Sequence, residues 1–235
     1  MRSADGEEES DPPGRPLGRR AFLGIVGLGL TSLAWGGGAA DLIAQTTRLL
    51  PEAVRGFVPF GKGWRIYAIQ TPYPTFHPAT WQLRIDGLVE HPQTLSYAQL
   101  LALPQARQTT DFHCVTGWSV DDVKWSGVRF ADLLAAAKPL PAARALRFES
   151  AEDPYIDSLT LDQAMEPDAM LAHGMDGGPL AREHGAPARL VMPKMYGYKG
   201  VKWVKRILVT DHVEDGYWEQ RGYDRDAWIG SSNGR

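Results

Sequence analysis

"PARLVMPKMYGYKGVKWVKRILVTDHV", residues 187–213, places an apolar run on each side of a basic loop. The runs 187–193 and 205–213 are short and rich in Leu, Ile and Val, a composition that predicts two β-strands. The segment 194–203 between them contains two glycines, which predicts a loop rather than a helix. Two strands joined in this way are typical of a sheet that is not built from βαβ units.

The rest of the chain alternates short strands with short helices. Residues 80–89 switch between apolar and polar side chains with the period of a half-buried strand, and Ser96 suits the N-cap of a helix over 96–103. We also predict an extended segment at 63–76, strands at 107–115 and 144–150, a helix at 129–137, a strand or helix at 157–165, and a helix at 167–180 that ends in a glycine-rich loop. This mixture predicts an α+β fold in a single domain.

Composition excludes several classes of protein. The chain of 235 residues carries a net charge of −3, and 43% of its residues are apolar. These values suit one globular domain with an ordinary core. They give no overall attraction for nucleic acid or for an anionic membrane surface, so we expect no nucleic-acid partner. A single cysteine rules out an intramolecular disulfide.

The N-terminus has the order of an export signal. Arg19 and Arg20 precede an apolar stretch, 21–35, and the small residues 36–40. A positive region, an apolar region and a small-residue cleavage site follow one another in signal peptides, and the paired arginines resemble a twin-arginine signal. The stretch of about 15 residues is shorter than the roughly 20 that a spanning helix needs. An uncleaved membrane anchor and a buried helix are the alternatives.

These features divide the chain into four parts. We predict a twin-arginine signal at 1–40, a linker with a short helix at 41–70, the main domain at 71–215, and a C-terminal tail at 216–235 that packs on the domain. The expected location is the periplasm or another compartment outside the cytoplasm, with a membrane tether if the signal is not cleaved.

The only cysteine, Cys114, lies in "DFHCVTGWSV" (111–120), where a predicted strand breaks into a turn. A lone cysteine is most often a small buried apolar residue, but a thiol presented by a loop can be a nucleophile or a metal ligand. The sequence contains no CxxC, HxH or HExxH pattern, so it gives little support to a metal site built from protein ligands alone. A metal that arrives with its own ligands would need only one thiolate.

Basic residues concentrate between Arg182 and Arg206. Seven of them and one acid, Glu183, give this segment a charge of 7 − 1 = +6 in a chain of net −3. A solvated basic face is one reading. Glycine-rich backbone beside Lys and Arg is also the usual way to hold a phosphate or a polyanionic cofactor. No Walker loop or GxGxxG motif is present, which argues against a nucleotide-binding domain.

Together, these motifs resemble the molybdopterin-binding domain of the sulfite oxidase family. The resemblance rests on "FHCVTGWSV…VKWSGVRFADLL", "LAHGMDGGPLAREHGAPARLVMPKMYGYKGVKWVKRI" and "GYWEQRGY", and it runs from Trp81 to Tyr223. It implies the sulfite oxidase-type fold, with mixed β-sheets and short helices, and a molybdenum–molybdopterin cofactor. The family includes sulfite oxidases, plant-type nitrate reductases and the catalytic subunit of the periplasmic methionine sulfoxide reductase, which is itself a twin-arginine substrate.

The resemblance also implies a set of site residues. Cys114 matches the catalytic cysteine whose thiolate binds molybdenum, while the pterin dithiolene and oxo groups complete the coordination. The implied cofactor-binding residues are Ser150, His184, Arg189 and the phosphate loop Lys199, Gly200, Val201 and Lys202. Tyr73 and His77 are expected to replace an N-terminal contact of the family. His113 is assigned to the cofactor site as well, with proton transfer and simple packing as alternatives.

The function implied is that of an exported molybdenum-cofactor-dependent oxidoreductase. It would transfer an oxygen atom to or from a small sulfur or similar oxo substrate, such as a sulfoxide or the oxo-anion sulfite. No CxxCH haem motif is present, so electrons would pass to or from a separate partner, a membrane haem protein or a soluble cytochrome. A cofactor-free binding module with the same fold and a cysteine-dependent hydrolase are the alternatives.

Overall fold

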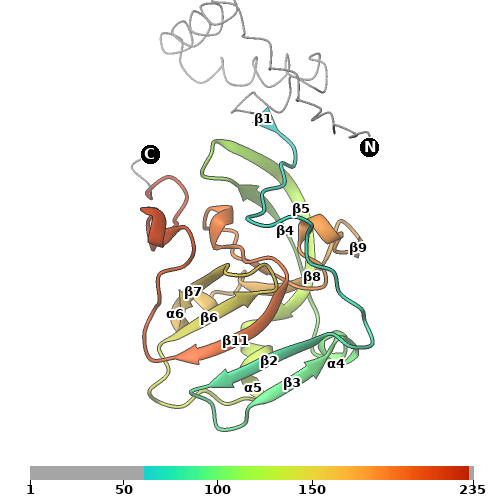
Figure 1. Cartoon of the computed structure of the whole chain (residues 1–235), viewed down its shortest axis with the longest axis vertical. Coiled ribbons are helices and arrows are strands. Elements are labelled where there is room, and N and C mark those ends of the chain that lie inside the picture. The colour runs from blue at the N-terminus through green and yellow to red at the C-terminus, as the bar shows by residue number, and fades with distance from the viewer. Residues whose placement is uncertain (1–60, 233–235) are drawn as a thin grey trace, which may run out of the picture. The chain divides into compact units, whose positions relative to one another are not determined.

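The computed structural model describes residues 61–232, so the predicted signal at 1–40 and the predicted linker and helix over 41–60 lie outside the described residues. Within the described part, none of the helices has the length and apolar character needed to span a bilayer. The fold predicted from the sequence is confirmed: two β-sheets are combined with short helices (Figure 1).

The first sheet has six strands in the order β1-β5-β8-β10, with β4 paired to β5 and β9 paired to β8. Its strands are β1 (Gly61–Lys62), β4 (Ala106–His113), β5 (Trp118–Arg129), β8 (Met170–Met175), β9 (Gly178–Pro179) and β10 (Arg189–Val191). The β1–β5 pair is parallel and the other pairs are antiparallel. Strands β4 and β5 form a long hairpin (Figure 1), and the cysteine turn lies at its end.

The second sheet has five strands in the order β3-β2-β11-β6-β7. Its strands are β2 (Gln82–Gly87), β3 (Gln93–Ser96), β6 (Ala145–Ser150), β7 (Ile156–Thr160) and β11 (Val204–Thr210). Strand β11 pairs parallel with β2 and antiparallel with β6, so the sheet is mixed. The two apolar runs that flank the basic loop therefore enter different sheets, β10 in the first and β11 in the second, and the loop between them connects the two.

Short helices connect the strands of the two sheets. They are α4 (Tyr97–Ala102), α5 (Phe130–Ala135), α6 (Leu161–Ala164) and the 3-10 turns η2 (Arg182–His184), η3 (Gly197–Lys199) and η4 (Glu219–Arg221). The predicted N-cap is confirmed: the Ser96 hydroxyl accepts from the N–H of Gln99, whose side chain in turn accepts from the N–H of Ser96. This reciprocal pair satisfies two backbone donors that a helix start leaves open.

The core lies on both faces of the first sheet. The larger apolar cluster fills the space against the second sheet and α5, and Val128, Leu171 and Leu190 project into it. A smaller cluster on the opposite face takes Trp125 and Met170, together with Val123, Ala172, Leu180, Ala186 and Val191. Partly buried side chains of Trp64 and Phe112 pack against this second cluster, which brings the N-terminal segment to the edge of the candidate site.

The helix predicted over 167–180 is wrong, because the segment forms β8 and β9. Strand β8 lies between β5 and β10, and successive side chains enter the two apolar clusters, so its sequence lacks the alternation that marks a half-buried strand. The informative signal was Asp176-Gly177. Both residues have positive φ, 51° and 87°, as a type I′ hairpin turn requires.

Candidate active site

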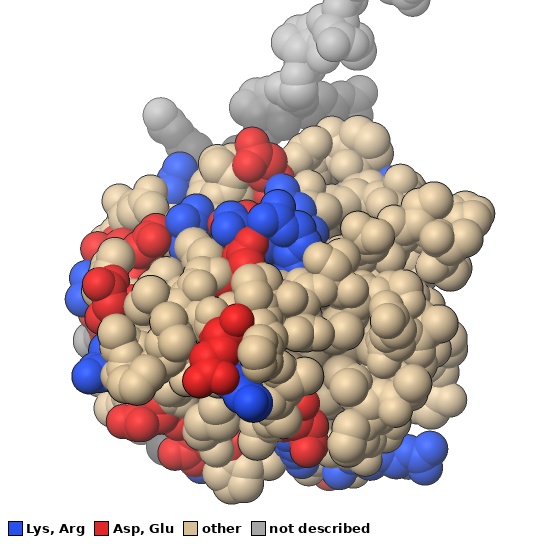
Figure 2. All heavy atoms as spheres, turned by 90° about the horizontal axis from the view of Figure 1, so that it is seen from below, with Lys and Arg blue, Asp and Glu red and all other residues tan. Residues whose placement is uncertain are grey.

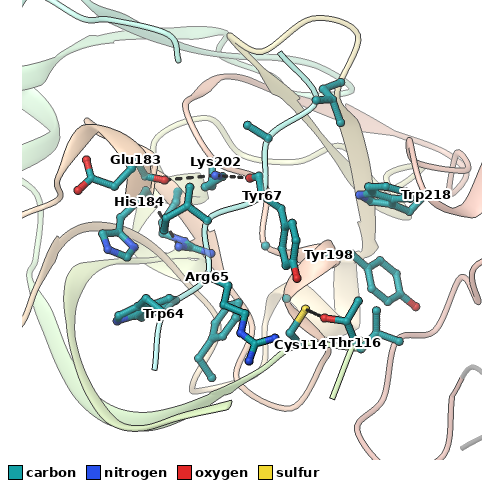
Figure 3. A pocket seen from close by; sticks show the side chains of 18 of the residues that line it. Trp64, Arg65, Tyr67, Cys114, Thr116, Glu183, His184, Tyr198, Lys202 and Trp218 are labelled. Atoms are coloured by element: carbon teal, nitrogen blue, oxygen red, sulfur yellow. Dashed lines mark hydrogen bonds between the residues drawn. The ribbon is translucent and has the colours of Figure 1, made fainter. Parts of the chain in front are cut away.

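A cavity of about 300 Å³ lies between the β4–β5 turn, residues 64–69, η2, η3 and the C-terminal tail (Figure 3). Its wall is mainly aromatic, formed by Trp64, Tyr67, Phe112, Trp118, Tyr155, Tyr198, Trp218 and Tyr223. Large apolar walls with a few convergent polar groups are typical of small-molecule and cofactor sites. The polar groups that line this cavity include Cys114, Arg189 and Lys202, which the sequence had singled out separately.

The cysteine lies in the turn that joins β4 to β5. The Cys114 N–H donates to the carbonyl of Trp118 at 2.9 Å, and the N–H of Gly117 donates to the Cys114 carbonyl at 3.0 Å. Gly117 has a φ of 89°, which side chains rarely adopt. The turn presents Sγ of Cys114 to the cavity, 3.2 Å from Oγ1 of Thr116 (Figure 3). Strand β4 ends at His113, so the predicted break from strand to turn at Cys114 is confirmed.

Arg189, the first residue of β10, supplies a buried positive charge. Its guanidinium lies 5.6 Å from the centre of the Phe112 ring and 5.2 Å from that of Trp125. Nη1 donates to the carbonyl of His184 at 3.2 Å, whereas Nε is buried without a hydrogen-bond partner among residues 61–232. Burial lowers the pKa of Arg189 to about 10, so the side chain stays cationic at neutral pH. A buried donor of this kind is costly unless a ligand satisfies it.

Lys202 supplies a second positive charge to the same cavity. Its Nζ donates to the carbonyls of Tyr67 at 2.7 Å and Glu183 at 3.2 Å (Figure 3). An ammonium group has three donors, so one is left for a ligand. Burial, followed by the charge of Arg189, lowers the pKa of Lys202 to about 8. Both effects disfavour the cationic form, and an anion bound in the cavity would favour it.

His184 lies at the end of η2, beside Arg189. Its ring meets the Trp64 ring edge-on at 4.6 Å, and Nδ1 is buried without a hydrogen-bond partner in the described chain. Burial, followed by the charge of Arg189, lowers the pKa of His184 below its usual range. The imidazole is therefore neutral at neutral pH and offers an unpaired ring nitrogen at the cavity wall.

Two glycines of the η3 region allow close packing at the cavity wall, Gly200 against Arg189 and Gly197 against Phe112. A Cβ on Gly200 would lie 3.2 Å from Nη2 of Arg189 and 3.2 Å from the carbonyl of Gly197. A Cβ on Gly197 would overlap the ring of Phe112. Backbone close to a ligand-binding cation is where glycine is required for space rather than for φ, and both glycines line the cavity.

Lys199 is bound inside the protein. Its Nζ donates to Oδ1 of Asp157 at 2.5 Å and to Oε1 of Glu219 at 2.8 Å, and all three side chains are at most 3% exposed. Burial, opposed in part by the charge of Lys199, raises the pKa of Asp157 well above its usual range. The cluster ties η3 to β7 and η4. Lys199 does not line the cavity, and its predicted contact with the cofactor stays a prediction.

Most other charges of the basic segment are also paired. Lys194 binds the carboxylate of Glu166, and Arg206 binds those of Asp86 and Glu149. Arg182 donates to the backbone carbonyls of Tyr73 and Pro74. On the face shown in Figure 2, Lys and Arg side chains lie beside Asp and Glu rather than forming one broad basic surface. The charge of the segment therefore reaches the cavity through Arg189 and Lys202.

Two further residues predicted to bind the cofactor, Ser150 and Val201, lie next to the cavity wall and not in it. The Ser150 hydroxyl donates to the carbonyl of Lys202 at 2.7 Å and accepts from the N–H of Glu152 at 2.9 Å, which fixes the backbone on which Lys202 stands. Val201 is fully buried in the larger apolar cluster. Neither side chain lines the cavity, whereas Gly200, which precedes Val201 in the chain, does.

Tyr73, His77 and His113 lie outside the cavity wall as far as the described residues show. Tyr73 stacks on Trp203, with ring centres 5.7 Å apart. His77 is exposed, and its Nδ1 accepts from the N–H of Ala79 at 3.3 Å. His113 is the last residue of β4 and pairs with Ser119 of β5. Their predicted contacts with the cofactor stay predictions.

The sequence interpretation missed residues 64–69 and the acidic wall residue Glu152. The N-terminal contact was predicted at Tyr73 and His77, but the cavity wall is formed by earlier residues, with Trp64, Arg65 and Tyr67 among them. The available signal was an arginine, Arg65, close to two aromatic residues in "GWRIY". Figure 3 shows the Arg65 side chain extending toward Cys114.

Comparison with known proteins gives consistent matches. Residues 70–218 match the family model described as "oxidoreductase molybdopterin binding domain". The uncharacterized oxidoreductase YuiH of Bacillus subtilis is 35% identical over an alignment of 171 residues that covers 68% of this chain and 86% of YuiH. The protein-methionine-sulfoxide reductase catalytic subunit MsrP of Gluconobacter oxydans is 36% identical over 194 residues, 75% of this chain and 61% of MsrP.

A solved structure agrees with these sequence matches. The sulfane dehydrogenase SoxCD from Paracoccus pantotrophus superposes with a TM-score of 0.57 at 29% identity, over 60% of this chain and 41% of the SoxCD chain. This chain therefore spans less than two thirds of the length of MsrP and of the SoxCD chain. The region 70–218 that matches the family model includes the cysteine turn, η2, η3 and the basic loop, so it contains most of the residues that line the cavity.

Proposed function

This chain belongs to the oxidoreductase molybdopterin-binding domain family, the family of the sulfite oxidases, and we propose that it is a molybdenum-cofactor-dependent enzyme for oxygen-atom transfer. The substrate would be a small sulfur or similar oxo compound, such as a sulfoxide or sulfite. One observation carries the proposal: a thiol, Cys114, a buried cation, Arg189, and a half-buried cation, Lys202, line the same aromatic-rich cavity.

The residues present fit the cofactor. Molybdopterin carries an anionic phosphate, and the cavity offers cationic donors together with a buried Nε of Arg189 and a buried Nδ1 of His184 that have no partner in the described residues. The absence of a side chain at Gly200 lets the Arg189 guanidinium pack directly against the backbone of the loop, which keeps the cation at the cavity wall. Within the described chain, no three His, Cys, Asp or Glu side chains converge on a metal-binding point, so a metal held here would take one thiolate from Cys114 and its remaining ligands from the cofactor.

Different residues of the cavity would bind different parts of the cofactor. Arg189, Lys202 and the backbone at Gly200 would hold the phosphate end by charge-assisted hydrogen bonds, and Cys114 would hold the metal. When bound, the cofactor supplies the two-electron oxygen-atom transfer that amino-acid side chains cannot perform. With a ligand bound, the aromatic wall would limit the access of water, which strengthens electrostatic interactions inside the site. Arg65 extends toward Cys114 and is placed to orient the polar oxygen of a substrate.

Export and the electron partner complete the proposal. The signal predicted at 1–40 supports transport of the folded, loaded protein across the membrane, which would place the enzyme in the periplasm. MsrP of Gluconobacter oxydans is named a catalytic subunit, which supports a separate partner here as well. A membrane haem protein or a soluble cytochrome would exchange electrons with the site one at a time.

Cofactor retention is expected to depend on pH through Lys202. The pKa of Lys202 is lowered to about 8, so the ammonium is charged below that pH and neutral above it, while a phosphate monoester with a second pKa near 6 stays dianionic. The value of about 8 describes the empty cavity, and a bound phosphate raises it, so above this pH cofactor binding has to take up a proton and weakens up to about 10-fold per pH unit. Molybdenum retained after dialysis one pH unit below and one above this pKa measures the effect.

The variant Lys202→Arg is the control for the pH dependence. A guanidinium stays charged across this range, so the variant should retain the cofactor equally at both pH values. A pH dependence that persists unchanged in Lys202→Arg would assign it to another group. Equal retention by the wild type at both pH values would show that Lys202 does not bind the phosphate.

A dye-coupled screen of molybdenum-loaded protein tests the proposed reaction. A reduced dye is offered with methionine sulfoxide and other sulfoxides, and an oxidised dye with sulfite. We expect turnover with one of these pairs, and the productive pair fixes both direction and substrate class. Loaded protein that turns over neither pair, but hydrolyses activated esters in a reaction blocked by alkylation of Cys114, would support a cysteine hydrolase instead.

A further inference from the structure

The strap, defined as residues 64–70, crosses the cavity and belongs to no helix or strand. Residues 64–69 line the cavity in succession, and Figure 3 shows Trp64, Arg65 and Tyr67 along its wall on the side that includes Cys114. The position of the strap therefore sets the space available to a substrate beside the thiol. An irregular segment has no ladder of its own to hold it, so its position depends on side chains from the body of the domain.

Glu152, in the turn between β6 and β7, supplies the first anchor. Its Oε1 accepts from the N–H of Ile69 at 2.5 Å and from the N–H of Gln70 at 2.9 Å. The N–H of Glu152 donates to Oγ of Ser150 at 2.9 Å, which fixes the turn that carries the carboxylate. One oxygen thus holds two successive backbone donors at the end of the strap.

Lys202 supplies the second anchor, through its bond to the Tyr67 carbonyl at 2.7 Å (Figure 3). The two anchors differ in what they do for the cofactor. Lys202 attracts an anion, whereas Glu152 places a negative charge on the wall of a cavity that would hold one, and its side chain is only 2% exposed. A carboxylate buried there works against anion binding. Its two bonds to the strap indicate a positional role instead.

We propose that Glu152 is a positioning residue of the active site: through its bonds to Ile69 and Gln70 it holds the strap, and with it Trp64, Arg65 and Tyr67, in place around Cys114. In this role it acts through the backbone N–H groups that it accepts and not through the chemistry itself. The kinetic consequence rests on the proposed function, whereas the order of the strap can be measured without turnover.

Three substitutions separate the position of the acceptor from its charge. Glu152→Gln keeps an oxygen at the same reach and loses the charge. Glu152→Asp keeps the charge and withdraws the oxygen by one methylene group, and Glu152→Ala removes both. Hydrogen exchange of the 64–70 backbone amides in molybdenum-loaded protein is the first readout. We expect wild-type exchange in the Gln variant and about 10-fold faster exchange in the Asp and Ala variants, since two modest hydrogen bonds are lost.

Steady-state kinetics with the productive substrate is the second readout. A displaced strap should raise KM about 10-fold in the Asp and Ala variants and change kcat less, because the groups that hold the cofactor are untouched. Glu183→Ala is a matched control: it removes a carboxylate from the same cavity wall, while Lys202 binds only its backbone carbonyl, so strap exchange should not change.

The pattern across the variants decides the proposal. If Glu152→Gln behaves like Glu152→Ala while Glu152→Asp behaves like wild type, the charge matters and the positional role is refuted. Equal exchange in all four proteins refutes the anchor. If Glu152→Ala does not fold, the contrast between Gln and Asp still gives the answer. An enzyme that turns over no oxo substrate refutes the proposed function, and the exchange pattern still tests the strap.

Discussion

Replacing Cys114 by serine is expected to abolish turnover while the protein still folds. A serine hydroxyl is not ionised at neutral pH and is a harder donor than a thiolate, so it cannot replace the soft anionic ligand. The substitution changes one atom in a half-buried turn whose shape depends on backbone bonds to Trp118 and Gly117, so the loss of stability should be small. Dye-coupled activity and a thermal melt of the same preparation measure the two effects.

One result for Cys114→Ser would contradict the prediction that the thiolate is required for turnover. Turnover retained by Cys114→Ser, at a molybdenum content equal to that of the wild type, would show that the thiolate is not required. An inactive variant that melts far below the wild type would leave the loss open to a folding defect, so Cys114→Ala is measured alongside. It removes the hydroxyl as well, and we expect it to be folded and equally inactive.

Replacing Arg189 by methionine is expected to lower cofactor occupancy strongly. The methionine keeps the apolar bulk between the Phe112 and Trp125 rings and removes the charge. Each charge-assisted hydrogen bond to the phosphate is worth about 1.5–3 kcal/mol, so affinity should fall about 10- to 100-fold. Molybdenum per chain after expression with full cofactor supply measures the change.

Stability of the cofactor-free protein distinguishes binding from structure. Arg189 is buried with an unsatisfied Nε among residues 61–232, and replacing such a cation by an apolar side chain is often neutral or stabilising. We therefore expect Arg189→Met to melt at or above the wild-type temperature when both lack cofactor. Lys205→Met, at an exposed lysine of the same basic segment, should keep full occupancy. Full occupancy in Arg189→Met would show that Arg189 does not bind the phosphate.

The sequence predicted the parts of the site that lie in short continuous motifs. Cys114 was placed at the end of a strand because turn residues follow it, and the structure has β4 end one residue earlier. Arg189 and Lys202 were selected from a basic run, and both line the cavity. The run could not show that Lys199 is neutralised by Asp157 and Glu219, because these partners lie 42 and 20 residues away in the chain.

The strap could not be located from sequence for a similar reason. Its contacts with Glu152 and Lys202 span about 80 and 135 residues, and no local pattern encodes such a distance. Strand β8 was missed because it is buried on both faces and its apolar residues do not alternate. Alternation of apolar and polar residues identifies strands that have one solvent-exposed face. Strand β8, at the centre of this sheet, has no such face.

The most direct test of the central claim is the number of sulfur ligands on bound molybdenum, measured by X-ray absorption on wild-type protein and on Cys114→Ser. The proposed site predicts three sulfurs in the wild type, two from the cofactor and one from Cys114, and the loss of one in the variant. A sulfur count that is the same in both proteins, or wild-type protein that binds no molybdenum under full cofactor supply, would contradict it.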